Sequence, residues 1–176
     1  MTSVILPYRG VLPTIDASAF VAPNTSLIGD IRVGAESSVW FGSTLRGDVQ
    51  PILIGARTSI QDNSVIHATD GWTPTVVGDD CVVGHRVILH GCSIGNRVLV
   101  GMGAIVMDGV EVGDDVLIGA GAILTPRTKV PSGTMVLGAP GKVKRELSTE
   151  ERVSILAGAQ HYVAKTREYR EILTSA

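Results

Sequence analysis

Aliphatic residues recur at every sixth position along most of this chain. Glycine often follows them, as at Gly34, Gly55 and Gly95. An amphipathic helix would repeat at about 3.6 residues and a half-buried strand at about 2, so a sustained period of six predicts a solenoid of short strands joined by tight corners. The repeating positions are Val21, Leu27, Val33, Val39, Leu45, Ile54, Ile60, Ile66, Val77, Val83 and Leu89, then, after one shorter step, Ile94, Val100, Val106, Val112, Ile118, Leu124, Val130 and Val136.

The predicted coils run from about residue 21 to residue 141 and contain two insertions. We expect a short insertion at Pro51–Leu53 and a longer one at Trp72–Val76. The first 20 residues are expected to cap the open end of the solenoid, where strand edges would otherwise lack partners. We therefore assign residues 1–147 to a solenoid domain that includes its N-terminal cap.

The character of the chain changes after the turn-forming sequence at 138–141. Ser148 and Glu151 have the S-x-x-E spacing of a capping box, which satisfies free amides at a helix start. The intervals of four and three residues that follow predict one helix from about 149 to 173, with one face against the coils. That face consists of Ile155, Ala159, Tyr162, Thr166, Tyr169 and Leu173. We assign residues 148–176 to this C-terminal helical unit.

Composition supports a thin core and argues against several classes of partner. Of the 176 residues, 44% are hydrophobic but only 4% are aromatic, which suits a narrow interior where large rings would push coils apart. The 15 basic and 17 acidic residues give a net charge of -2 without a basic run, so we expect neither nucleic acid nor a membrane as a partner. The first residues lack the features of an export signal, which makes a cytoplasmic location the expectation.

Three histidines carry the candidate chemistry. If three hexapeptides make one triangular coil, with Trp72–Val76 outside the count, equivalent residues stack from coil to coil at roughly 4.8 Å. His67 and His90 each follow the leading aliphatic residue of the same face. They should therefore stack directly and form a pair of metal ligands. His85 lies on another face, a corner before His90, and is poorly placed to reach a metal held by the other two.

A symmetric trimer would complete the site. A threefold axis brings the face of His85 in one subunit against the face of His67 and His90 in the next, giving three equivalent sites. Three imidazoles without a fourth protein ligand are typical of catalytic zinc, whose open position holds a water with a pKa lowered to about 7. Iron or cobalt would also accept this ligand set. The alternative is that the histidines are ordinary surface or core residues.

Further polar residues fall in the same columns. Arg46 should stack one coil below the histidine pair, and Asp48 follows it. Asp62 takes the slot that His85 occupies one coil later, with Gln61 beside it. These four residues are candidates for the pocket and for the subunit boundary around it. The alternative for Arg46 and Asp48 is a structural ion pair across the trimer interface, which is compatible with a role in supporting the ligands.

Several motifs together resemble the gamma-class carbonic anhydrase family. They are L-R-G-D at Leu45–Asp48, I-Q-D-N at Ile60–Asn63, the histidine of V-I-H at His67, G-H-x4-H-G at Gly84–Gly91 and G-x-P-x-K-x-x-R-E-L at Gly138–Leu147. The resemblance covers almost the whole chain. It implies an all-β solenoid, a left-handed parallel β-helix of hexapeptide repeats with a C-terminal α-helix, that forms homotrimers. It also implies zinc held between subunits by His67, His85 and His90.

The same resemblance implies an activity and a role for each remaining candidate. The activity is reversible hydration of carbon dioxide to bicarbonate by metal-bound hydroxide. Arg46 and Asp48 become an intersubunit pair, Gln61 orients the hydroxide, and Asp62 joins that network. Tyr162 is similar to a family tyrosine whose hydroxyl reaches toward the pocket. Its alternative role is a core ring on the helix face.

The chain also departs from the archaeal prototype of that family. Val49 replaces a glutamate, Asp70 is the sole acid of a shorter loop that would supply a proton shuttle, and Ala164 replaces an asparagine. Because each turnover must release a proton, these departures predict a low rate even where the site is intact.

Two other functions stay open. Many hexapeptide-repeat proteins transfer acyl groups with a histidine base, and some relatives of the gamma class are thioesterases. An enzyme acting on acyl-CoA is therefore one alternative, although such transferases need no three-histidine cluster. The other alternative is a non-catalytic metal-binding trimer in which the metal clamps the subunits together.

Overall fold

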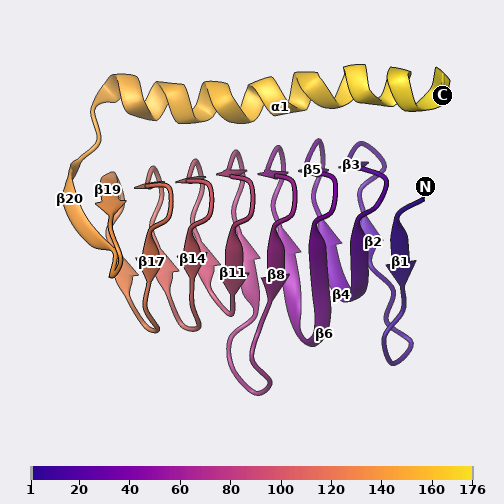
Figure 1. Cartoon of the computed structure of the whole chain (residues 1–176), viewed down its shortest axis with the longest axis horizontal. Coiled ribbons are helices and arrows are strands. Elements are labelled where there is room, and N and C mark those ends of the chain that lie inside the picture. The colour runs from indigo at the N-terminus through magenta and orange to yellow at the C-terminus, as the bar shows by residue number, and fades with distance from the viewer. Residues whose placement is uncertain (1, 176) are drawn as a thin grey trace.

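The computed structural model describes residues 2–175, which form a column of stacked coils with one long helix alongside (Figure 1). The first strands are β1 (Val4–Leu6), β2 (Thr14–Ile15), β3 (Phe20–Val21), β4 (Ser26–Val33), β5 (Ser38–Val39), β6 (Thr44–Ile54), β7 (Ser59–Ile60), β8 (Val65–His67), β9 (Thr75–Val77) and β10 (Val82–Val83). The later strands are β11 (Ile88–His90), β12 (Ser93–Ile94), β13 (Leu99–Val100), β14 (Ile105–Val106), β15 (Glu111–Val112), β16 (Leu117–Ile118), β17 (Ile123–Leu124), β18 (Lys129–Val130), β19 (Thr134–Leu137) and β20 (Lys142–Glu146). The helix α1 spans Thr149–Ser175.

Strands pair in parallel with their counterparts one coil away. For example, β11 lies between β8 and β14, and β12 lies between β9 and β15. Three faces result: two are joined through the long strands β4 and β6 into a 12-stranded sheet, and the third is an 8-stranded sheet that ends with β20 antiparallel to β19. The predicted left-handed parallel β-helix of hexapeptide repeats with a C-terminal α-helix is confirmed.

The residues that repeat with a period of six form the hydrophobic core. Every predicted repeat position is buried except Val21, which is partly buried and packs against the same cluster. Leu27, Leu45 and Leu89 are completely buried, so leucine as well as β-branched residues fits between the coils. Each aliphatic side chain stacks on its counterpart in the next coil, which gives a continuous column of dispersion contacts and apolar burial.

One corner of the column carries opposite charges in successive coils. Arg57, Asp80, Arg97 and Asp115 all adopt left-handed backbone conformations with φ between 52° and 56°, a region that non-glycine residues seldom occupy. Arg57 donates to both carboxylate oxygens of Asp80 at 2.6 and 2.8 Å, and Arg97 donates to both oxygens of Asp115 at 2.7 and 3.0 Å. These bidentate pairs join neighbouring coils at positions with a left-handed backbone conformation.

Both predicted insertions are present, but their boundaries differ from the prediction. Gly29 pairs with Gly47 and Ile31 with Ile52, so the extra residues of the short insertion lie between Gly47 and Ile52 and not at Pro51–Leu53. Ile52 is completely buried and belongs to the regular coil. The longer insertion precedes β9, because Thr75 and Val76 already pair in the sheet.

The N-terminal residues extend the sheet. β1 and β2 each run parallel to β4, at the two halves of that strand. This segment covers the edge of β4 with main-chain hydrogen bonds, yet Val4, Leu6 and Leu12 remain exposed. The division of the chain into a capped solenoid and a separate C-terminal unit stays a prediction.

The helix lies along the column and returns toward the N-terminal coils (Figure 1). The capping box is present: the Glu151 carboxylate accepts from Ser148 N at 2.9 Å, and Glu151 N donates to Ser148 Oγ at 3.3 Å. Ile155 and Ala159 are buried as predicted, whereas Leu173 at the end of the same face is exposed. Within residues 2–175, no helix has an apolar stretch long enough to cross a membrane.

Candidate functional site

His67 and His90 stack on the outer surface of one face. They end β8 and β11, and the two residues are direct partners in the parallel ladder. Nδ1 of His67 lies 3.2 Å from Nε2 of His90, and the ring centroids are 5.2 Å apart. The predicted stacking is therefore present. Strand register alone produces it, because side chains one coil apart on the same face must point the same way.

Each of these rings also contacts an aspartate on its opposite side. Nε2 of His67 lies 3.0 Å from Oδ1 of Asp48, and Nδ1 of His90 lies 3.0 Å from Oδ2 of Asp108. An ionised carboxylate can only accept, so each neutral ring places its N–H on its aspartate. The nitrogens that face each other are then free of the aspartates, and in two neutral rings their lone pairs would repel unless a proton or a metal cation lies between them.

His85 lies elsewhere, as the sequence predicts. It follows the 8-stranded sheet, its Nδ1 lies 2.9 Å from Oδ2 of Asp62, and 45% of its side chain is exposed. Among residues 2–175, no three His, Cys, Asp or Glu side chains gather closely enough to hold a metal ion. One chain thus presents two converging imidazoles and, separately, a third histidine whose Nε2 is not engaged by Asp62.

Arg46 and Asp48 form an ion pair within the chain. Arg46 Nη1 lies 2.5 Å from Asp48 Oδ2, and the other Asp48 oxygen bonds His67. Desolvation acts to raise the pKa of Asp48, but hydrogen bonds from Arg46 and His67 outweigh it and hold the pKa below its ordinary value. Asp48 therefore stays ionised as the acceptor for His67. The predicted pairing of Arg46 and Asp48 between subunits stays a prediction.

A groove under α1 brings together the other candidates. It has a volume of about 430 Å³ and is lined by Gln61, His85 and Tyr162 together with apolar residues such as Val82 and Met102. Gln61 is 5% exposed. Burial raises the pKa of Tyr162, and the negative charge of Asp62 raises it further, so the hydroxyl remains a neutral donor at physiological pH.

Tyr162 also packs as a ring on the helix face, which is the alternative role expected from the sequence. Its ring meets Trp40 edge-on at 5.9 Å and extends an aromatic cluster that contains Phe20 and Tyr169. The ring thus packs against the coils while its side chain lines the groove. Both descriptions of this residue hold geometrically, and its catalytic role stays a prediction.

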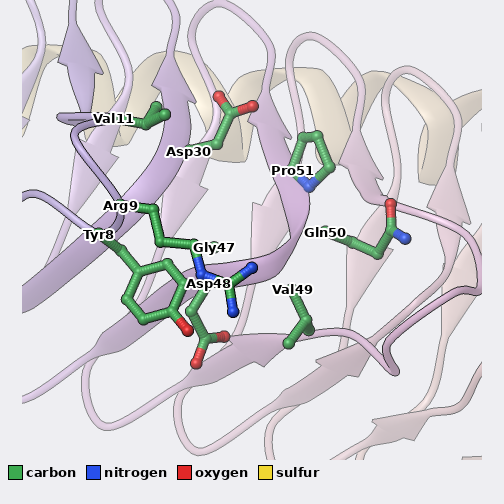
Figure 2. Close-up of a pocket in the computed structure, with 9 residues that line it drawn as sticks. All are labelled: Tyr8, Arg9, Val11, Asp30, Gly47, Asp48, Val49, Gln50 and Pro51. Atoms are coloured by element: carbon green, nitrogen blue, oxygen red, sulfur yellow. The ribbon is translucent and has the colours of Figure 1, made fainter.

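A smaller hollow of about 180 Å³ adjoins Asp48 on the side away from the helix. Figure 2 shows Arg9 and Tyr8 extending from the N-terminal segment toward Gly47 and Asp48. The Arg9 guanidinium also lies 5.3 Å from the Tyr8 ring centroid. Sequence reasoning treated this segment only as a cap, and no motif pointed to Arg9. Asp108 was missed as well, although it lies in the column that follows His90.

Comparison with known proteins gives the family. The profile described as "Bacterial transferase hexapeptide (six repeats)" matches residues 91–126. A carbonic anhydrase of Geobacillus kaustophilus is 41% identical over 96% of this chain and 92% of its own length. The mitochondrial gamma carbonic anhydrase 2 of Arabidopsis thaliana is 41% identical over 86% of this chain and 56% of its own length. The chain belongs to the gamma carbonic anhydrase family.

Solved structures agree on the fold of this gamma carbonic anhydrase family member. A structure from Bacillus cereus described as a putative acetyltransferase superposes with a TM-score of 0.95 at 41% identity, covering 98% of this chain and 99% of that one. The similarity extends over the whole molecule, helix included. The description of that structure names a different activity from that of the carbonic anhydrase relatives, so fold likeness alone does not choose between them.

Membership of the gamma carbonic anhydrase family suggests a metal cofactor, and the donor set of this chain fits one. Zinc bonded to two imidazoles at about 2.0–2.1 Å in a tetrahedral arrangement holds the nitrogens about 3.3 Å apart. Nδ1 of His67 and Nε2 of His90 are 3.2 Å apart. Ligating histidines commonly donate their other N–H to a carboxylate, which Asp48 and Asp108 accept here.

Proposed function

We propose that this protein is a carbonic anhydrase-like metalloenzyme that reversibly hydrates carbon dioxide to bicarbonate. Zinc would be held by His67 and His90 of one subunit and His85 of a neighbouring subunit in a homotrimer, with iron or cobalt as alternatives. The observation that carries the proposal is the pair of imidazole nitrogens that face each other at 3.2 Å while the other nitrogen of each ring contacts an aspartate. Relatives named carbonic anhydrase support the choice of reaction.

The residues around the histidines have separable tasks. A divalent metal held by three imidazoles supplies an activated water at neutral pH and a positive charge that stabilises developing negative charge. Asp48 holds the ring of His67, and Arg46 keeps Asp48 ionised. Asp62 holds His85.

The groove residues act on the substrate side. The amide of Gln61 is almost fully buried and can orient a reacting oxygen by hydrogen bonding. The neutral hydroxyl of Tyr162 can donate to the product carboxylate. Hydration releases one proton per turnover, and the chain offers only Asp70 in its short loop for transferring that proton, which is the physical reason to expect slow turnover.

A trimer is supported by what surrounds the histidine pair. Val65 and Ile88 stand beside His67 and His90 on the same face, and their exposed fractions are 43% and 37%. Met107, one coil further, is also exposed at 37%. An apolar stripe next to polar ligands suits an interface between subunits better than a free surface. Burying it against the His85 face of a neighbour would close the site.

Stopped-flow hydration of carbon dioxide tests the proposal, with protein loaded with zinc or, without air, with iron. We expect activity above background with at least one metal, and about one metal per chain. His161 on α1 is exposed and lies outside the site, so His161→Ala is the matched control and should retain both properties. Background rates with both metals at full loading would contradict the enzymatic proposal and favour a metal-clamped, non-catalytic trimer.

A second function, acyl transfer or thioester hydrolysis, is favoured by two observations. One is the B. cereus structure described as a putative acetyltransferase, and the other is the apolar lining of the groove beside His85. A reaction of this kind would use His85 as a base and need no metal. Turnover of acetyl-CoA by metal-free protein, abolished in His85→Ala but retained in His67→Ala, would favour this function over hydration.

A further inference from the structure

The carboxylate of Asp108 occupies a space that Gly91 leaves open. Ile88 and Leu89 of β11 pair with Ile105 and Val106 of β14, so Asp108 stacks on Gly91, the residue after His90. A Cβ at Gly91 would lie 2.4 Å from Oδ1 of Asp108, and the backbone there has φ +53°. The absence of a side chain at Gly91 is therefore what admits the carboxylate next to the ring of His90.

Asp108 differs from Asp114, whose Oδ1 also lies close to a glycine of the preceding coil. A Cβ at Gly95 would lie 2.5 Å from Oδ1 of Asp114, one coil later. That oxygen accepts from Asn96 N at 2.8 Å, and the other oxygen of Asp114 accepts from Arg97 at 3.2 Å. Asp114 thus caps the backbone of a corner. Capping of the Asn96 amide therefore accounts for the aspartate at position 114.

Backbone capping does not explain Asp108. Its Oδ2 bonds Nδ1 of His90 at 3.0 Å, while its Oδ1 is buried and has no hydrogen-bond partner among residues 2–175. A buried carboxylate oxygen without a partner is unfavourable by itself, so the position is poorly explained as a contribution to stability. The contact that remains to account for it is the one with the histidine ring.

We propose that Asp108 is a positioning residue that holds the N–H of His90 on Nδ1 and thereby turns the lone pair of Nε2 toward His67. The use of that lone pair to bind a metal rests on the proposed function; the orientation of the ring does not. Asp108 touches neither substrate nor reacting atoms in this assignment. It completes a set in which each candidate ligand has its own aspartate: Asp48 for His67, Asp62 for His85 and Asp108 for His90.

Ring tautomers in metal-free protein test the assignment directly. Protein labelled with 15N in histidine gives long-range proton–nitrogen correlations that identify which nitrogen of His90 carries hydrogen. We expect Nδ1–H in the wild type and in the control Asp114→Asn, and a shift toward Nε2–H in Asp108→Ala. Persistence of Nδ1–H at His90 in a folded Asp108→Ala variant would overturn the proposal.

The affinity for zinc provides a second, independent measurement on the same variants. Zinc affinity, measured by competition with a chelator, should fall about 10- to 100-fold in Asp108→Ala, the range usual for groups that orient ligands. The fall should be smaller in Asp108→Asn, which keeps an acceptor oxygen and the volume of the side chain. Unchanged affinity in both variants would contradict the positioning role. If the wild type binds none of zinc, iron and cobalt while Asp108→Ala still shifts the His90 tautomer, the metalloenzyme would be refuted and the orientation of His90 by Asp108 would stand.

Discussion

The two halves of the candidate site are built by different means. The His67–His90 edge depends on strand register: the rings point together because β8 and β11 are parallel neighbours. The groove with Gln61, His85 and Tyr162 depends on α1, which closes it from above. The first half is therefore as rigid as the column, whereas the second requires a docked helix. Substitutions at the His67–His90 edge should alter catalysis with little effect on folding. Substitutions in the groove should affect catalysis and folding together.

The largest effect is expected at the edge. His67→Ala removes one of the two converging nitrogens, so we expect loss of bound metal and a decrease in carbon dioxide hydration of more than about 100-fold, beyond the range for groups that merely orient ligands. Thermal unfolding measured on metal-free protein should change little, since the ring lies on the outer surface. Metal analysis and stopped-flow assays measure the effect. Full metal content in the variant would contradict ligation by His67.

His85→Ala should affect assembly as well as metal. The variant removes the contribution of one subunit to the site of the next, so we expect loss of metal together with a weaker trimer. Analytical ultracentrifugation and metal content measure the two consequences in the same sample. Loss of metal from an equally stable trimer would argue against coupling between the groove histidine and subunit association.

Tyr162 allows chemistry and packing to be separated. Tyr162→Phe keeps the ring against Trp40 at 5.9 Å and removes only the hydroxyl, so we expect a lower kcat, by about 10-fold, with unchanged unfolding at neutral pH. Tyr162→Ala removes the ring and should also cost about 1–2 kcal/mol, less than for a fully buried ring. Equal kcat in wild type and Tyr162→Phe would assign the residue to packing alone.

The pKa of Tyr162 makes a further distinction possible. It is raised in the folded protein by burial and by Asp62, so folding favours the protonated hydroxyl. The associated stability is complete below the unfolded pKa of about 10 and is lost as pH rises through the folded value. Alkaline unfolding should therefore be more gradual in Tyr162→Phe than in wild type, and identical curves would show that Tyr162 is not a significant contributor.

The smallest effect is expected at the start of α1. Hydrogen bonds from Arg145 and then from Ser148 N lower the pKa of Glu151 to about 2. Because the folded pKa is depressed, this contribution is present above the unfolded pKa of about 4.3 and is lost as pH falls toward 2. Glu151→Gln should lower Tm only slightly at pH 7, because the pair is exposed to solvent, and remove part of the acid sensitivity. Near-ultraviolet circular dichroism of the Trp40–Tyr169 contact reports whether the helix remains docked.

The sequence predicts those features that repeat and fails for those that do not. The period of six places the buried positions, because a column of equivalent residues has a single solution for its interior. The same stacking places His67 on His90 and keeps His85 apart. The predicted boundaries of both insertions were wrong, because the hexapeptide period shows that residues have been added but not where the added loop begins or ends. Ile52 and Thr75 are buried strand residues that a count by hexapeptides assigns to the loops.

The sequence also failed to predict contacts that depend on the direction of individual side chains. Asp108 lies in the column of Gly91, but the sequence does not reveal that its carboxylate contacts the ring of His90, whereas that of Asp114 accepts from a backbone amide. Arg9 lines the hollow beside Asp48 from a segment without any repeat, so no periodic argument could place it. Leu173 continues the apolar helix face but has no coil beneath it to pack against and remains exposed.

The alternating charges at one corner limit how many coils can be removed from a protein of this kind. Arg57, Asp80, Arg97 and Asp115 follow one another coil by coil. Excising a single coil would bring two arginines or two aspartates into contact, whereas excising two would restore attraction. We expect the shorter excision to be the more damaging one, and thermal unfolding of both deletion variants would show whether whole turns of this molecule can be lost singly or only in pairs.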